Sequence, residues 1–294
     1  MDHMNNLNIL VTGGAGFVGT NLIKKLVSEG HTVTSIDNYS TGYETNHIDG
    51  CTYIYGDCKS PDMNWPENKI DVIFHLAALT RIQPSLKNPT ETIENNFNGT
   101  LRILEKARED NIQVIYASSS SMHYGLYGSP YALSKFGGEE LCKLYSSIYD
   151  LNTTICRFYN VYGPDQITEG DYATVVGIFL KQYQNKQPLT ITGKGNQRRD
   201  FTHVDDIVDA LYRCIGKKYF RAEIFELGRG VNHSINEVAD MFGDYPVKYI
   251  PARRGEYPFT LCADMNAYDK LGWVPNKNLE DYIKQNKEKC RNKY

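Results

Sequence analysis

Residues 12–19 are TGGAGFVG, and they directly follow the apolar run NILVT at residues 8–12. The apolar run is typical of a buried strand, and the spacing of apolar residues over 17–28 is helical. Gly13, Gly16 and Gly19, spaced three residues apart, therefore stand where a strand turns into a helix. Glycine permits the tight turn and lets the backbone approach a pyrophosphate. The helix N-terminus would add N–H groups and a positive dipole end.

A carboxylate farther along makes this turn a candidate dinucleotide site. Asp37 ends a second predicted strand at residues 32–36, 24 residues after Gly13. A carboxylate there accepts hydrogen bonds from ribose hydroxyls and repels a 2′-phosphate, which favours NAD over NADP. The alternative is that Asp37 is only a turn residue in Asp-Asn-Tyr-Ser.

Two later segments extend this predicted cofactor site. Asp57 follows a short predicted strand at residues 52–55 and is placed to accept from the adenine amine. The run VIFHL at residues 72–76 predicts another strand, and the alanines at 77 and 78 leave room for a flat ligand. We expect His75 to be a strand residue rather than a ligand.

Strands and helices alternate through the first half of the chain. Further strands are predicted at residues 114–118 and 154–158, with helices near 92–109 and 131–149. This βαβα order predicts an α/β fold with a Rossmann-type, doubly wound parallel sheet covered on both faces.

The regular alternation of predicted strands and helices becomes less clear after residue 165. We therefore expect an NAD-binding Rossmann domain at residues 1–165 and a smaller α/β C-terminal substrate-binding lobe at residues 166–294, with some segments interleaved. The elements predicted in the lobe are helices near 172–185, 205–215, 266–272 and 279–289, a helix from about 234, and strands at 189–192 and 224–227.

Composition excludes several classes of partner. The net charge is −3 and no basic patch stands out, which argues against a nucleic-acid partner. No apolar run approaches the roughly 18 residues that a membrane span needs. The seven cysteines form no CxxC pair, so we predict no metal site, reduced thiols and a cytoplasmic location.

Tyr131 and Lys135 form a candidate acid–base pair. Ser129 and Pro130 are a good N-cap and first helical residue, which places Tyr131 in the first turn and Lys135 on the same face. A cation beside the phenol, together with the positive helix end, is expected to lower the tyrosine pKa from about 10 toward neutrality. A general base needs such a pKa.

Four serines at residues 118–121 follow the strand at 114–118. The carboxyl end of a strand faces the ligand crevice of an open α/β sheet. One of these hydroxyls is expected to hydrogen-bond the substrate oxygen that Tyr131 deprotonates. For the other three, an ordinary polar turn is the alternative.

Ordered motifs continue to the end of the chain. They are TGGAGFVG (12–19), HLAA (75–78), NNFNGT (95–100), SSSSMHYG (118–125), SPYALSK (129–135), RFYNVYGP (157–164), RRDFTHVDD (198–206), RRGE (253–256) and LGW (271–273). In this order they resemble the extended short-chain dehydrogenase/reductases, and specifically their NAD-dependent nucleotide-sugar epimerase/dehydratase group.

The resemblance implies a role for each matching position. The implied NAD set is Gly13, Gly16, Phe17, Val18, Asp37, Asn38, Asp57, Cys58, Leu76, Ala77, Ala78, Asn96, Tyr131 and Lys135. The implied catalytic residues are Tyr131, Lys135 and Ser120, the last counted five residues before Gly125. The implied substrate-binding residues are Ser121, Asn160, Arg199 and Arg253.

The two arginines have a physical reason, because a guanidinium pairs bidentately with phosphate. Alternatives stay open for both. Arg199 would instead pair with Asp200, or Arg254 would take the role of Arg253.

The residues after the catalytic serine separate the reactions of this family. Relatives that eliminate water carry an Asp-Glu pair there and the related decarboxylases carry a Glu, whereas this chain has Ser121 and Met122. Without an acid to protonate a departing hydroxyl, dehydration is disfavoured. We therefore expect an NAD-dependent epimerase acting at C4 of a nucleotide-diphosphate hexose, with a UDP-sugar favoured, through a 4-keto intermediate.

Other outcomes remain on the same scaffold. They are 4,6-dehydration, decarboxylation and epimerisation at C2, C3 or C5. A non-catalytic NAD-binding protein is a reading of a different class, and the retained Tyr131 and Lys135 disfavour it.

The resemblance also implies a homodimer. Relatives pair the helices that correspond to 92–109 and 131–149 into a four-helix bundle. The apolar residues Leu101, Leu104, Leu141, Leu144 and Ile148 lie on those helices, and some must face their own sheet.

The stretch between Gly125 and Tyr131 is shorter than in relatives. This indicates an open or reshaped pocket, suited to a substituted hexose or a uronate. His123 stands where relatives prefer valine, and we favour packing over a pocket role for it.

Overall fold

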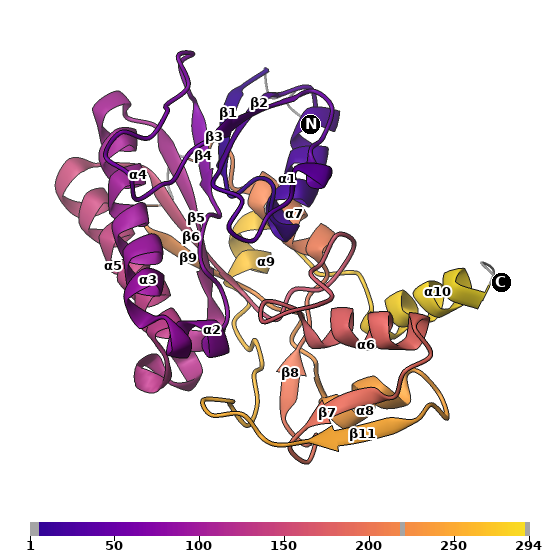
Figure 1. Ribbon diagram of the computed structural model, residues 1–294. Helices are drawn as coiled ribbons and strands as arrows, with labels where there is room; N and C mark the ends of the chain where they lie inside the picture. The colour runs from indigo at the N-terminus through magenta and orange to yellow at the C-terminus, as the bar shows by residue number, and fades with distance from the viewer. Residues whose placement is uncertain (1–5, 218–220, 292–294) are drawn as a thin grey trace.

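The computed structural model describes residues 6–217 and 221–291, and its centre is a parallel seven-stranded sheet (Figure 1). The strand order is β3-β2-β1-β4-β5-β6-β9. The strands are β1 Asn8–Thr12, β2 Thr32–Asp37, β3 Cys51–Tyr55, β4 Val72–His75, β5 Gln113–Ser119, β6 Thr153–Phe158 and β9 Glu223–Leu227. The order changes direction between β1 and β4, where an open α/β sheet binds its ligands. The predicted Rossmann-type fold is confirmed.

Helices cover both faces of the sheet (Figure 1). One face carries α1 (Phe17–Ser28), α7 (Val204–Arg213) and α9 (Asn266–Leu271), and the other carries α4 (Gly99–Asp110) and α5 (Pro130–Tyr149). Within β1, Ile9 and Val11 belong to the first of these apolar clusters and Leu10 to the second. A strand buried on both faces needs a continuous apolar run, and residues 8–12 supply it.

The helix predicted at 92–109 is instead three consecutive helical pieces. They are α3 (Pro89–Ile93), a π-helical turn (Glu94–Asn98) and α4. A π turn holds one extra residue, so it changes the face that the following helix presents; such turns are frequent at functional sites. A short helix that the sequence did not predict, α2 (Ile82–Lys87), precedes them.

A second group of elements packs below the sheet in Figure 1. It contains α6 (Val175–Gln184), the parallel pair β7 (Leu189–Thr192) and β11 (Val247–Ile250), the antiparallel pair β8 (Arg198–Asp200) and β10 (Asn232–Ser234), α8 (Ile235–Asp240) and α10 (Leu279–Arg291). Its core is a third apolar cluster that includes Phe179 and Phe242. Ser234 and Glu237 form a capping box that starts α8.

The second half of the chain also builds the central sheet. Strand β9 pairs in parallel with β6, and the apolar residues of α7 join the cluster that contains Ile9 and Val11. The division at residue 165 stays a prediction, and these segments are the ones that cross it.

Within residues 6–217 and 221–291, no helix combines the length and apolar character needed to cross a bilayer. Over the same ranges, no group of three or more His, Cys, Asp or Glu side chains is arranged to hold a metal ion. All seven cysteines are free thiols.

Candidate active site

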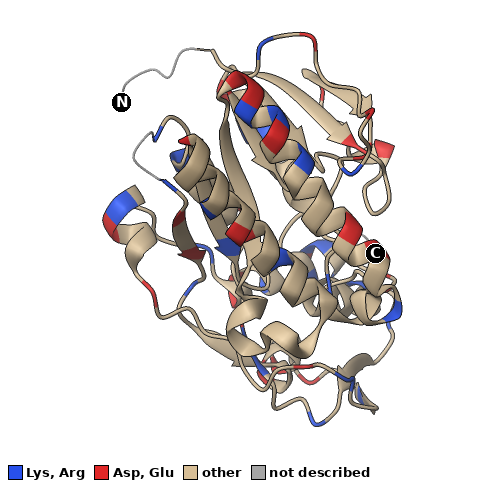
Figure 2. Ribbon diagram, turned by 90° about the vertical axis from the view of Figure 1, so that its left-hand side faces the viewer, with Lys and Arg blue, Asp and Glu red and all other residues tan. Residues whose placement is uncertain are grey.

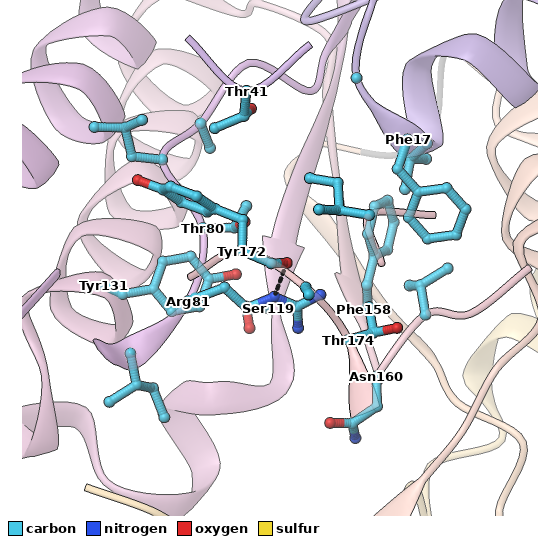
Figure 3. A pocket seen from close by; sticks show the side chains of 18 of the residues that line it. Phe17, Thr41, Thr80, Arg81, Ser119, Tyr131, Phe158, Asn160, Tyr172 and Thr174 are labelled. Carbon is cyan, nitrogen blue, oxygen red and sulfur yellow. Dashed lines mark hydrogen bonds between the residues drawn. The ribbon is translucent and has the colours of Figure 1, made fainter. Parts of the chain in front are cut away.

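A cavity of about 460 Å³ opens along the carboxyl edge of the sheet (Figure 3). Its wall runs from the glycine turn past the ends of β2, β4, β5 and β6 to the second group of elements. All but two of the residues predicted for the site line this cavity; the exceptions are Asn96 and Lys135. The fold therefore brings together residues more than 200 positions apart in sequence, from Gly13 to Arg253.

The glycine turn offers bare backbone to the cavity. Gly13 has φ +75°, and a Cβ added to it would lie 2.8 Å from the Ala77 nitrogen. A Cβ on Gly19 would lie 2.3 Å from the Gly13 carbonyl oxygen. Side chains are therefore excluded where α1 begins, and a phosphate group can approach the N–H groups of the helix end. This part of the cavity fits a dinucleotide.

The adenosine end carries the predicted carboxylates. Asp37 accepts hydrogen bonds from the backbone nitrogens of Ala15 (2.9 Å) and Tyr39 (2.8 Å), which fixes its orientation at the end of β2. Burial raises the pKa of Asp37, and these hydrogen bonds oppose that rise. Asn38 donates to Asp57 at 3.3 Å, so the two predicted polar residues form one edge of the cavity.

Asn96 has a supporting position behind the cavity wall. Its buried amide accepts from the Leu79 nitrogen (2.8 Å) and donates to the Leu79 oxygen and to Ser134 (both 2.9 Å). The segment after β4 is thereby fastened to α5. His75 is also structural, as predicted: it lies between Thr12 and Thr100, and burial lowers its pKa to about 3.

Tyr131 lines the cavity from the first turn of α5 (Figure 3). Ser129 caps that helix by accepting from the Ala132 nitrogen, and Pro130 is its first residue, as the sequence predicted. Lys135 is buried one turn later, with its ammonium nitrogen 4.3 Å from the centre of the Tyr116 ring.

The predicted lowering of the tyrosine pKa is wrong in direction. Burial raises the pKa of Tyr131, and a hydrogen bond with Ser119 and the charge of Arg81 offset this only in part. Burial also lowers the pKa of Lys135 to about 7, which weakens the positive charge that was expected to act on the phenol. Burial is thus the largest influence on the pKa of each group.

All four serines at residues 118–121 line the cavity. Ser119 accepts from the Ser121 nitrogen and is also the serine that hydrogen-bonds Tyr131, whereas the resemblance implied Ser120. The hydroxyl of Ser121 is buried and has no hydrogen-bond partner in the described part of the chain. A buried hydroxyl without a partner is costly, so this wall is suited to a polar ligand.

The opposite side of the cavity holds the predicted substrate residues. Asn160 donates to the Asp200 oxygen and to Thr260, both at 2.9 Å. Arg199 donates to the backbone oxygens of Arg198 and Tyr257 and does not pair with Asp200. The Asp200 carboxylate instead accepts three backbone N–H groups, from Arg229, Gly230 and Cys262.

Of the two neighbouring arginines, Arg253 lines the cavity and Arg254 does not. The geometry therefore favours Arg253 over Arg254 as the phosphate-binding residue and disfavours a pairing of Arg199 with Asp200.

A buried network of charges lies outside the cavity wall. Arg157 on β6 pairs with Glu139 on α5 (2.6 Å) and with Glu226 on β9 (2.7 Å). His123 meets the same Glu226 carboxylate at 2.7 Å and does not line the cavity. His123 therefore belongs to this network, which ties the end of the serine segment to the edge of the sheet.

Arg81 is a cavity residue that the sequence did not predict (Figure 3). It lies between β4 and α2 with φ +83° and ψ 143°, a region that favours glycine. Such strain costs about 1–3 kcal/mol and is found mainly at functional sites. The one sequence feature that pointed to Arg81 was its position as a cation soon after β4, a strand whose carboxyl end lies at the cavity.

The comparisons with known proteins agree with this geometry. Residues 9–228 match the NAD dependent epimerase/dehydratase family, and the chain belongs to that family. A putative UDP-glucose 4-epimerase of Methanocaldococcus jannaschii is 33% identical, with 94% of this chain and 96% of the relative covered.

Two further similar proteins bear on the reaction. A UDP-N-acetyl-alpha-D-glucosaminuronate decarboxylase of Bacillus cytotoxicus is 35% identical, with 78% of this chain and 77% of that protein covered. The solved structure of UDP-glucose 4-epimerase from Thermotoga maritima with UDP-glucose has a TM-score of 0.87 at 28% identity, covering 98% of this chain and 99% of that one. The predicted family is confirmed.

Proposed function

We propose that this protein is a nucleotide-sugar 4-epimerase that acts on a UDP-sugar with NAD as its cofactor. One observation carries the proposal: Tyr131 and the serine segment open into the same cavity as the bare glycine turn. A sugar hydroxyl at Tyr131 would then lie beside a dinucleotide on the turn.

The residues of the chain have distinct tasks in this reaction. The glycine turn, Asp37 and Asp57 hold the dinucleotide, and Arg199 and Arg253 pair with the substrate diphosphate. The Tyr131 oxygen takes the proton of the sugar 4-hydroxyl, while a neighbouring serine hydroxyl hydrogen-bonds the same oxygen. Burial opposes this role by raising the pKa of Tyr131, and the hydrogen bond with Ser119 and the charge of Arg81 favour it by lowering that pKa. NAD, when bound, supplies the hydride acceptor at C4 and the donor for the return step. Once the 4-keto sugar has turned its other face toward the cofactor site, Tyr131 would return the proton to the C4 oxygen.

The acids that line the sugar side are already engaged. Asp171 pairs with Lys87 at 2.6 Å, and Glu256 stabilises the charge of Arg199. Residues 121–122, where relatives that eliminate water carry an acid, have no carboxylate. Epimerisation needs no such acid, so it is favoured over dehydration.

Proton NMR of the purified protein with UDP-, GDP-, dTDP-, CDP- and ADP-sugars, without added NAD, tests the proposal. We expect a product of equal mass with one inverted ring proton, at C4 of a UDP-sugar. A product lighter by water or carbon dioxide would overturn the 4-epimerase assignment. Failure to convert any sugar, with NAD supplied, would favour a binding protein instead.

A homodimer through α4 and α5 is proposed on the exposed apolar residues of α5. Leu144 and Ile148 are 46% and 64% exposed, whereas Leu104 and Leu141 face their own sheet. Figure 2 looks onto this helix layer, where much of the ribbon carries no charged residue. Pairing α4 and α5 with their copies would bury these side chains in a four-helix bundle.

Sedimentation equilibrium of the wild-type protein and of Leu144→Glu tests the dimer. We expect twice the chain mass for the wild type and a shift toward the single chain for the variant. A wild-type protein with the mass of one chain at micromolar concentration would contradict the dimer.

A cytoplasmic location is proposed because all seven cysteines are free thiols.

A further inference from the structure

Arg81 is a guanidinium inside the cavity without an acid partner. Within the described part of the chain it forms no ion pair, and its one hydrogen bond runs from Nε to the Tyr172 oxygen at 3.2 Å. An arginine has five N–H donors, so both terminal nitrogens keep theirs free. The side chain is half-buried, and burial lowers the pKa of Arg81, a cost that an acidic group of a ligand would offset.

The position of Arg81 relates it to the reacting end of the cavity. Figure 3 shows it in the same part of the cavity as Tyr131 and Ser119. Its charge also acts on the Tyr131 phenol, as the pKa values of both groups show. The cavity thus has a free cation close to the atom that would take a proton from the sugar.

The other arginines of the cavity have different surroundings. Arg199 is held by the Arg198 and Tyr257 carbonyls, and Arg253 comes from the segment between β11 and α9. These two suffice for the two phosphates of a nucleotide diphosphate. Arg81 is a third cation, and it comes from the sheet side of the cavity.

The chemistry of a hexose tells which group such a cation would meet. When the 4-hydroxyl lies at Tyr131, the substituent on C5 is one carbon away from the reacting carbon. In a hexose this substituent is a neutral hydroxymethyl group, and in a uronic acid it is a carboxylate. A carboxylate accepts two parallel N–H bonds from a guanidinium, whereas a neutral hydroxymethyl group leaves the charge unpaired.

We propose that Arg81 pairs with the C6 carboxylate of the sugar, so that the preferred substrate is a nucleotide-diphosphate uronic acid. The inference rests on the proposed function, because Tyr131 must hold the 4-hydroxyl. It also accounts for the strained backbone at Arg81, since a glycine would remove the strain and with it the guanidinium.

Initial rates with UDP-glucuronate and UDP-glucose test this specificity. The wild type should have the higher kcat/KM with UDP-glucuronate. In Arg81→Gln, kcat/KM for UDP-glucuronate should fall about 10- to 100-fold more than for UDP-glucose, mainly through KM. Arg81→Lys should lie between the two, because it keeps the charge and loses the planar fork.

Two further variants separate recognition from folding. Arg81→Gly suits the positive φ, so it should melt no lower than the wild type and still lose the preference for the uronate. Arg221→Gln removes an exposed cation paired with Asp150 and should leave both rates unchanged. Equal losses for the two sugars in Arg81→Gln would overturn the role of Arg81.

Calorimetric titration with the same two nucleotide sugars gives the answer without turnover. Tighter binding of UDP-glucuronate that disappears in Arg81→Gln supports the inference, even if the protein were found not to epimerise. Conversion of UDP-glucose at C4 with weak binding of UDP-glucuronate would overturn the inference and leave the proposed function intact. Loss of carbon dioxide from UDP-glucuronate would support the carboxylate contact and overturn the 4-epimerase assignment.

Discussion

Replacing Tyr131 by phenylalanine should lower kcat by about 10²- to 10⁴-fold, the usual contribution of a positioned general base. The phenol oxygen is the group that takes and returns the proton in the proposed reaction, and phenylalanine removes only that oxygen. The KM for the nucleotide sugar should change much less, because Arg199 and Arg253 are untouched. Steady-state rates with the sugar found by NMR measure both constants.

Tyr127→Phe is the matched control, since Tyr127 is four residues earlier and 90% exposed. It should keep the wild-type rate. The Tyr131→Phe protein should also melt within a few degrees of the wild type and keep its bound NAD. Near-normal turnover by Tyr131→Phe would contradict the proposed mechanism.

Replacing Arg157 by methionine should lower the free energy of unfolding by about 3–5 kcal/mol at pH 8, because two buried carboxylates lose their cation. The Arg157 side chain is 9% exposed, and those of Glu139 and Glu226 are 0% and 6% exposed. Urea unfolding at fixed temperature measures the loss. The exposed pair of Arg108 with Glu105 is the control, and Arg108→Met should cost under about 1 kcal/mol.

The effect of Arg157→Met should depend on pH in a definite direction. Burial raises the pKa of Glu226, but His123 and Arg157 outweigh it and hold the pKa below its ordinary value. Without Arg157 only His123 opposes burial, so the pKa of Glu226 should rise relative to the wild type. The variant then loses stability relative to the wild type as pH rises, so its deficit should be smaller at pH 5 than at pH 8. An equal or larger deficit at pH 5 would contradict this account.

The sheet could be predicted because its strands are buried on both faces and therefore form continuous apolar runs, as residues 8–12 and 72–76 do. The turn at Gly13 and the start of α5 at Ser129 could also be predicted, since each depends on a local requirement of the backbone. The three-residue strands β8 and β10 were missed because so short a segment has no periodicity. The π turn at Glu94–Asn98 was missed because nothing in that helical pattern marks the extra residue.

The sequence predicted which residues line the cavity better than it predicted their pKa values. Nearly every predicted residue lines the cavity, because the motifs fix the carboxyl ends of the strands. The pKa of Tyr131 was mispredicted, since it depends on enclosure by segments far away in the chain. Arg81 was missed because neither its positive φ nor its lack of an ion pair among the described residues can be deduced from its neighbours in sequence.

The placement of β9 has a consequence for synthesis on the ribosome. The outer edge of β6 pairs with β9, which is residues 223–227. The other six strands of the sheet are therefore synthesised well before β9 leaves the ribosome exit tunnel. During that interval the growing chain presents an unpaired parallel edge, which a chaperone or another nascent chain could occupy. A circular permutation that opens the chain between β6 and β9 places β9 before β6 in synthesis, so the outer edge of β6 should find its partner already made.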